Sequence, residues 1–137
     1  MLELRGVHAV YGLSHVLHGV TLTAREGEVI SLLGRNGAGK STTLKAMMGL
    51  VRVTAGAVAL LGRSLLGLAP VVVRRLGDAI TALKRDGLTI VLSEQNVKFA
   101  RRLADRAYII EKGEIKFEGP MTALDADEPL RRAYLGV

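Results

Sequence analysis

Apolar and polar residues alternate along two stretches near the N-terminus, 2–11 (LELRGVHAVY) and 15–24 (HVLHGVTLTA). Such alternation is typical of strands with one buried face, so the two stretches predict a pair of antiparallel strands. Two shorter runs are apolar nearly throughout, 27–34 (GEVISLLG) and 88–93 (LTIVLS). They predict strands buried on both faces, as in a parallel sheet, and 57–61 (AVALL) predicts one further strand.

Helical patterns separate these strands. One helix is expected to begin at Lys40, and a second at Pro70, after which apolar residues recur at helical spacing until Gly87. Residues 96–104 (NVKFARRLA) show an amphipathic helical pattern. The alternation of strands and helices indicates an α/β fold.

The C-terminal part adds a hairpin and a short helix. Residues 106–119 (RAYIIEKGEIKFEG) predict two strands that turn at Lys112 and Gly113. Asp127 precedes Glu128 and Pro129, and this order predicts a helix start with Asp127 as its cap.

Composition narrows the class of protein. The chain has 137 residues, of which 49% are hydrophobic and 4% aromatic, so residues 1–137 are expected to form one soluble α/β domain packed with aliphatic side chains. No apolar run is long enough to span a membrane, and the N-terminus lacks the layout of a signal peptide, so a cytoplasmic location is expected. The absence of cysteine excludes disulfides, zinc–thiolate sites and cysteine nucleophiles.

The net charge of +6 raises the question of nucleic-acid binding. The basic residues come in pairs on segments whose other faces are apolar, and no aromatic side chains lie among them to stack on bases. The pairs are Arg74 with Arg75, Arg101 with Arg102, and Arg131 with Arg132. Solvated helix faces explain this pattern better, so no nucleic-acid partner is expected.

Residues 34–41 (GRNGAGKS), here called the phosphate loop, match the pattern G-x-x-x-x-G-K-[ST]. Glycines permit positive φ angles, so successive N–H groups can surround a phosphate at a helix N-terminus. Lys40 would reach the β- and γ-phosphates and the Ser41 hydroxyl would bind the metal, so ATP and Mg²⁺ are the expected ligands. The alternative is a glycine-rich turn without a ligand, but the predicted strand before the loop and helix after it favour phosphate binding.

The histidines give no comparable signal. His15 and His18 are three residues apart on a predicted strand, so alternation predicts that their side chains point to opposite faces. No cysteine or carboxylate partner accompanies them, and they are expected to be structural or solvent-facing.

Longer segments closely resemble the ATP-binding subunits of ABC transporters. They are VYGLSHVLHGVTLTAREGEVISLL (10–33), GRNGAGKSTTLKAMMGL (34–50), GLAPVVVRR (67–75), GLTIVLSEQN (87–96) and ADRAYIIEKGEIKFEGP (104–120). Within that family the chain is most similar to the smaller ATPase subunit of branched-chain amino acid importers. The resemblance implies a P-loop ABC ATPase core with an N-terminal antiparallel β subdomain and no helical subdomain. The phosphate loop then lies in residues 1–66 and the switch region in residues 67–137.

The resemblance also implies roles for individual residues. Lys40 and Gln95 would be catalytic, and Gln95 stands where most ABC ATPases have a switch histidine. A glutamine can orient phosphate or water by hydrogen bonds but cannot act as a base near neutral pH. Tyr11 would stack on adenine. Nucleotide contacts are expected from Tyr11, Gly34, Asn36, Gly37, Ala38, Gly39, Lys40, Ser41 and Thr42, with Ser41 also a metal ligand.

Two of these roles have simpler alternatives. Tyr11 could be a half-buried tyrosine at a strand end. Gln95 could be an ordinary polar residue at a helix start.

A complete family member also has a glutamine loop that faces the permease, a helical subdomain, an LSGGQ-type signature and an apolar strand that ends in Asp-Glu. None of these features is found in the sequence. The segment TIVLSE ends in Ser93 and Glu94, but the resemblance places it at the switch strand. We hypothesise that a middle block was deleted between two similar stretches, now merged at residues 67–70. The alternative is a naturally short protein. The strand at 88–93 would then be left as an apolar sheet edge, and hydrolysis by this chain alone would be negligible.

The resemblance implies an importer subunit that binds ATP and, when complete, hydrolyses it to drive uptake of branched-chain amino acids or a related solute. Its partners would be permease subunits and a second ATPase subunit, at the cytoplasmic face of the inner membrane. The alternative is a nucleotide-binding remnant that does not transport. A small-molecule kinase is a third reading, which the match of the C-terminal half to the transporter pattern disfavours.

Overall fold

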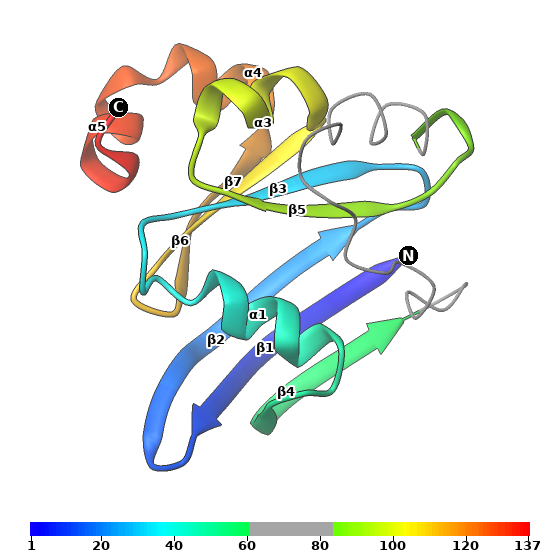
Figure 1. Ribbon diagram of the computed structural model, residues 1–137, viewed down its shortest axis with the longest axis vertical. Coiled ribbons are helices and arrows are strands. Elements are labelled where there is room, and N and C mark those ends of the chain that lie inside the picture. The colour runs from blue at the N-terminus through cyan, green and yellow to red at the C-terminus, as the bar shows by residue number, and fades with distance from the viewer. Residues whose placement is uncertain (61–83) are drawn as a thin grey trace.

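The computed structural model describes residues 1–60 and 84–137, which form two β-sheets with helices around them (Figure 1). The helix predicted to begin at Pro70 and the stretch at 67–70 lie outside the described residues. Within the described parts the fold is α/β, as predicted, with an antiparallel sheet beside a mainly parallel one.

The first sheet has three antiparallel strands in the order β2-β1-β4. They are β1 (Leu2–Tyr11), β2 (Ser14–Ala24) and β4 (Arg52–Leu60). The pairing of β1 with β2 confirms the two alternating stretches. Strand β4 begins at Arg52, five residues before the predicted start at 57, because it stays paired with β1 through the less apolar segment.

The second sheet has the order β5-β3-β6-β7, and β3 is parallel to both of its neighbours. Its strands are β3 (Val29–Leu33), β5 (Ile90–Glu94), β6 (Arg106–Glu111) and β7 (Glu114–Pro120). Every residue of β3 is buried, as its apolar run predicted. In the described part of the chain β5 pairs only with β3, so it forms the sheet edge expected for the switch strand.

Among the residues that the structure describes, four helices have defined bounds: α1 (Lys40–Met47), α3 (Val97–Leu103), α4 (Met121–Ala126) and α5 (Glu128–Leu135). Asp127 caps α5 by accepting a hydrogen bond from the N–H of Leu130, as predicted. Helix α4 was not predicted, because six residues are too short for a helical period to show. No helix in residues 1–60 or 84–137 has both the length and the hydrophobicity needed to cross a bilayer.

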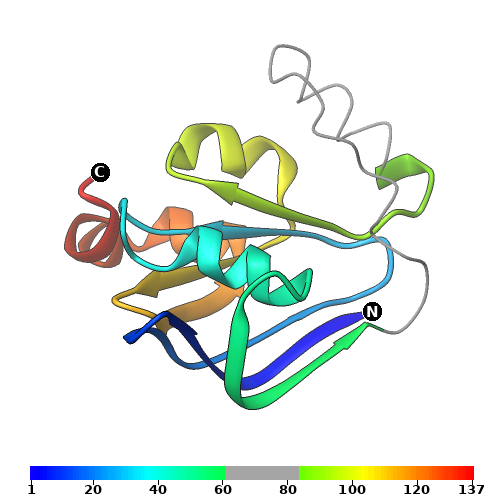
Figure 2. The ribbon, with the colours of Figure 1, turned by 60° about the horizontal axis from the view of Figure 1, so that its bottom comes forward.

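Other elements cover both faces of the parallel sheet (Figure 2), and buried apolar residues fill the layer on each face. One face packs against the antiparallel sheet and α1, where Ile30 and Leu32 of β3 meet Leu4, Leu17 and other buried residues. The opposite face carries Leu33 and Ile109, which pack against α3 and α4. Because the side chains of β3 alternate between two apolar layers, the strand that leads into the phosphate loop is fixed from both sides.

The turn at Lys112 and Gly113 joins the two sheets to the phosphate loop. The N–H of Gly113 donates to the carbonyl of Ala38 over 2.8 Å, and its carbonyl accepts from the N–H of His18 over 2.9 Å. Gly113 has a φ of +78°, and a Cβ there would lie 1.9 Å from the carbonyl oxygen of Val16. Only glycine therefore allows the hairpin to approach β2 so closely.

Arg106 forms the main polar connection between the sheets. Its guanidinium donates to both carboxylate oxygens of Glu28, to the carbonyl of Thr23 over 2.7 Å and to Glu118 over 3.0 Å. The hydroxyl of the buried Tyr108 accepts from Arg106 and from the N–H of Thr23. Since only 14% of the Arg106 side chain and 11% of the Glu28 side chain are exposed, solvent screens this ion pair weakly.

We predict that Gly113→Ala destabilises the chain far more than Gly12→Ala. Both glycines have positive φ, but nothing lies within 4 Å of a Cβ at Gly12. Gly12→Ala should cost about 1–2 kcal/mol, and Gly113→Ala about 3 kcal/mol or more because its methyl group also meets backbone. Urea unfolding of the two variants measures the difference, and equal losses would contradict the close approach of the hairpin to β2.

The Glu28 carboxylate should make stability fall in acid. Burial raises the pKa of this carboxyl, but hydrogen bonds from Arg106 and from the N–H of Arg25 outweigh it and lower the pKa below its usual value of 4.5. A lowered folded-state pKa means that the stabilisation is present at neutral pH and is lost as the pH falls below 4.5 through the folded-state pKa.

Glu28→Gln should be less stable at neutral pH by about 1.5–3 kcal/mol and should lose stability less steeply on acidification. The free energy of unfolding, measured from neutral pH down to about pH 3, tests this expectation. The residual slope of the variant includes Asp105, whose pKa is also lowered: burial raises it, but hydrogen bonds from Lys84 and from the N–H of Val29 outweigh that effect. Parallel curves for the two proteins would contradict the role of Glu28.

Candidate nucleotide-binding site

The phosphate loop leaves the carboxyl end of β3 and leads into α1, as the sequence predicted. Gly37 and Gly39 have φ angles of +80° and +112°, which L-residues with a side chain rarely adopt. Gly34 is required for another reason, since a Cβ there would lie 2.5 Å from the carbonyl oxygen of Ile110. Gly37 and Gly39 therefore allow the curvature of the loop, and Gly34 allows the loop to pack against β6.

The N-terminus of α1 has the features of an anion-binding site. Gly39 occupies the N-cap position and offers no side chain to the first amides of the helix. The carbonyl of Gly39 accepts from both the N–H and the hydroxyl of Thr43, which fixes the first turn. Ser41 is exposed, whereas Thr42 is buried. A helix N-terminus with unpaired N–H groups and a neighbouring lysine fits a polyphosphate group.

The ammonium of Lys40 lies folded back on its own loop. It donates to the carbonyl of Gly34 and, over 3.1 Å, to the carbonyl of Arg35. Burial lowers the pKa of Lys40, and the charge of Glu94 opposes that shift. Lys40 is thus held at the loop by neutral acceptors, which a phosphate oxygen could replace with a stronger, charged acceptor.

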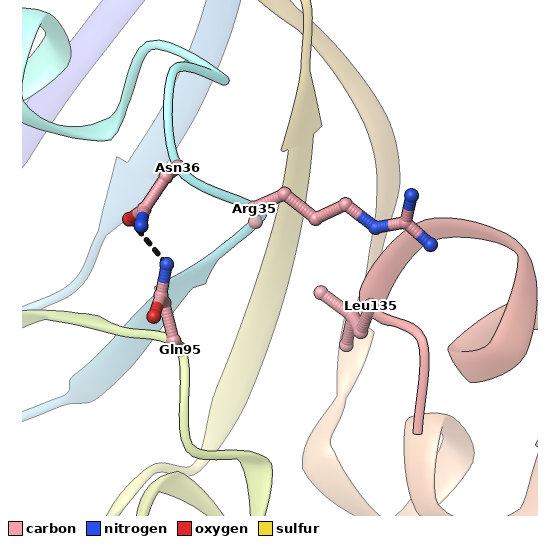
Figure 3. A pocket seen from close by; sticks show the side chains of 5 residues that line it. Arg35, Asn36, Gln95 and Leu135 are labelled. Carbon is pink, nitrogen blue, oxygen red and sulfur yellow. Dashed lines mark hydrogen bonds between the residues drawn. The ribbon is translucent and has the colours of Figure 1, made fainter.

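The parallel register of β5 with β3 brings Gln95 to the phosphate loop. Leu33 of β3 pairs with Glu94 of β5, so both strands end at the same edge of the sheet. The side-chain amide of Gln95 donates there to the side-chain oxygen of Asn36 (Figure 3). Both line a pocket of about 260 Å³ whose other walls are Gly34, Arg35 and Leu135. In Figure 3 the Arg35 side chain extends away from Asn36, toward Leu135 at the end of α5.

Glu94 is the carboxylate that the sequence analysis set aside. One oxygen of Glu94 accepts from the N–H groups of Gln95 and Asn96, over 2.8 and 2.9 Å. The same carboxylate interacts electrostatically with Lys40. Its closeness to the phosphate loop follows from the parallel pairing of β5 with β3, which the two apolar runs indicated without fixing which strands are neighbours.

Tyr11 lies at the end of β1, apart from the residues that line this pocket. Its side chain is 42% exposed, and the ammonium of Lys45 lies 5.2 Å from the centre of its ring. The exposed ring leaves a face to which a flat base could add, so adenine stacking stays a prediction.

The prediction that His15 and His18 point to opposite faces is wrong. An extra residue of β2 lies between them, and their rings are 4.2 Å apart between centroids. The alternation rule holds only for a strand without bulges. The pattern of apolar residues in the sequence does not reveal this bulge.

Comparisons with known proteins identify relatives over most of this architecture. The family described as ABC transporter matches residues 17–131. The chain is 43% identical over 77 residues to the high-affinity branched-chain amino acid transport ATP-binding protein BraG of Pseudomonas aeruginosa, covering 56% of this chain and 33% of that protein. It is 42% identical over 109 residues to the galactose/methyl galactoside import ATP-binding protein MglA of Treponema denticola, covering 80% of this chain and 20% of that protein.

The chain thus spans a third or less of the length of these curated relatives. Among solved structures, an ATP-binding subunit of an ABC transporter covers 99% of the chain with a TM-score of 0.76 and 21% identity. A nucleotide-free ATP-binding cassette from an ABC transporter covers 94% with a TM-score of 0.76 and 14% identity. At these identities the likeness shows the fold, and it agrees with the expected ATPase core.

Proposed function

This chain belongs to the ABC transporter family, and we propose that it binds magnesium ATP at residues 34–42 as the ATP-binding part of an importer. The observation that supports the proposal most strongly is the arrangement of Lys40 and Gln95 around one loop. Lys40 lies at the N-terminus of α1, and Gln95 reaches the loop from the neighbouring strand. Lys40 and Gln95 come from segments far apart in the sequence, and each bonds to the loop on which we propose that a terminal phosphate binds.

Each residue of the loop has a distinct part in the proposed binding. Lys40 would exchange the carbonyls of Gly34 and Arg35 for phosphate oxygens, and the first N–H groups of α1 would hold the β-phosphate. The exposed hydroxyl of Ser41 would ligate Mg²⁺, which neutralises charge on the phosphates when bound. Gln95 would orient the γ-phosphate or a water molecule through its amide.

We propose branched-chain amino acids as the solute of the parent importer. The support is the similarity to BraG together with the sequence GLTIVLSEQN around Gln95. Other relatives are named for galactose or octopine transport, so the ATP-binding part by itself discriminates weakly between solutes. Permease subunits and a second ATPase subunit would be the partners, with this chain on the cytoplasmic face of the membrane.

A second candidate function is a nucleotide-binding remnant that transports nothing. It is favoured by the missing LSGGQ-type signature and Asp-Glu strand, and by the small share of the relatives that the chain covers. Glu94 accepts from the main-chain amides of Gln95 and Asn96 and would not by itself position an attacking water and the metal. Both candidates share ATP binding and differ in ATP hydrolysis.

We predict that the chain binds magnesium ATP and that Lys40→Ala weakens this binding by about 10- to 100-fold, since one charge-assisted contact is lost. Calorimetry measures the affinity. Lys98→Ala removes the same charge from an exposed position on α3 and serves as the control. Unchanged binding by Lys40→Ala would overturn the proposed site.

Steady-state turnover then separates the two candidates. ATP hydrolysis by the chain that disappears in Lys40→Ala would support a working ATPase and would contradict the remnant function. Binding without turnover would support the remnant.

Tyr11→Ala should weaken ATP binding about tenfold, because a base that stacks on an aromatic ring loses that contact. Tyr11→Phe keeps the ring and should bind as the unsubstituted chain does. Inorganic tripolyphosphate has no base, so its affinity should be the same for all three proteins. If Tyr11→Ala binds ATP normally, Tyr11 is only a partly exposed residue at a strand end.

A further inference from the structure

All three histidines of the chain meet at one place. His8 lies on β1, His15 and His18 lie on β2, and each offers a ring nitrogen within 4.8 Å of the others. The Nδ1 of His8 and the Nε2 of His15 are 3.2 Å apart. His8 is half-buried, whereas His15 and His18 are exposed, so the cluster opens to solvent.

Two irregularities in the pairing of β2 with β1 bring the three histidines together. Ala9 pairs with Leu17 but Val10 pairs with His15, so Val16 is an extra residue without a partner on β1. An extra residue reverses the alternation beyond it. His15 therefore comes to the same face as His18 instead of the opposite one.

The second irregularity lies at Gly19. Val7 pairs with Val20 and His8 with His18, so Gly19 is again an extra residue, with a φ of +78°. The shift sets His8 directly opposite His18. Because Val7 and Ala9 are fully buried, His8 between them points to the face away from the core.

The spacing of the nitrogens fits shared coordination of one ion. Two nitrogens that each lie 2.0–2.1 Å from a tetrahedral zinc ion are about 3.3 Å apart. The Nδ1 of His8 and the Nε2 of His15 are already at that spacing, and the His18 ring lies 4.2 Å from the His15 ring between centroids. Turning the exposed rings of His15 and His18 would complete a three-nitrogen set without moving the backbone.

We propose that His8, His15 and His18 form a site for one divalent transition-metal ion, with zinc as the best match. Neutral imidazoles suit zinc, copper and nickel, and three of them leave one position for water. Hard ions such as magnesium or calcium prefer oxygen ligands and would bind here poorly. The Glu114 carboxylate interacts electrostatically with His18 and adds negative charge near the site.

The histidine site shares no residue with the proposed nucleotide site, but main-chain hydrogen bonds connect the two. His18 donates its main-chain N–H to Gly113, which in turn donates to Ala38 in the phosphate loop. An ion held by β1 and β2 would thus brace the sheet against which the loop rests. The alternative is a pair of neutral histidines, His8 and His15, that share a hydrogen bond and bind nothing.

The test is a zinc titration of the full chain without an affinity tag and without nucleotide, measured by calorimetry. One zinc ion should bind per chain, and His15→Gln and His18→Gln should each weaken binding by at least about tenfold. Both histidines are exposed, so neither change disturbs the core. Lys40→Ala is the matched control that keeps all three histidines and should bind zinc normally even though ATP binding is impaired.

Cobalt substitution gives a second readout. Co²⁺ bound by three imidazoles and water should show the intense visible absorption of a near-tetrahedral ion, and this band should disappear in His15→Gln. No zinc binding by the unsubstituted chain, or binding by His15→Gln and His18→Gln that is as tight as that of the unsubstituted chain, would overturn the site. A failure of ATP binding with zinc binding intact would count against the nucleotide proposal alone.

Discussion

The hydrogen bonds of Gly113 are the constraint on which the rest of the arrangement depends. One main-chain group of this glycine bonds to the phosphate loop and the other to β2, and no side chain fits between the turn and Val16. The same turn therefore sets how far the antiparallel sheet lies from the loop. Gly34 and Gly39 allow the phosphate loop to approach β6 closely, because a Cβ at either position would contact Ile110 of β6. The loop is shaped by the β6–β7 hairpin as much as by its own sequence.

This support explains how the phosphate loop can be formed in a chain that lacks an acidic Asp-Glu strand. The contacts that hold the loop come from β6, from the turn at Gly113 and from Gln95 at the end of β5. Leu135 closes one wall of the pocket from the last helix. None of these groups belongs to the LSGGQ-type or Asp-Glu segments, so the shape of the loop does not depend on contacts from those segments.

The sequence predicted most of the elements because their signals are local. The alternation in β1 and β2, the apolar run of β3 and the cap at Asp127 each involve neighbouring residues, and the structure confirms them. Contacts between distant segments were harder to predict. The bulge at Val16 arises from pairing with β1, so the gathering of the histidines could not be read from spacing. The closeness of Glu94 to Lys40 depends in the same way on which strand lies beside β3.

The bonds of Gly113 also fix the order in which the molecule can be assembled during translation. Ala38 and His18 emerge from the ribosome early, whereas Gly113 belongs to the last third of the chain. Synthesis proceeds at roughly 5–20 residues per second, so the phosphate loop waits several seconds for the hairpin that shapes it. Contacts of such long sequence separation close late and slowly in folding. A nascent chain would therefore carry the whole P-loop sequence well before the hairpin could give the loop its folded shape.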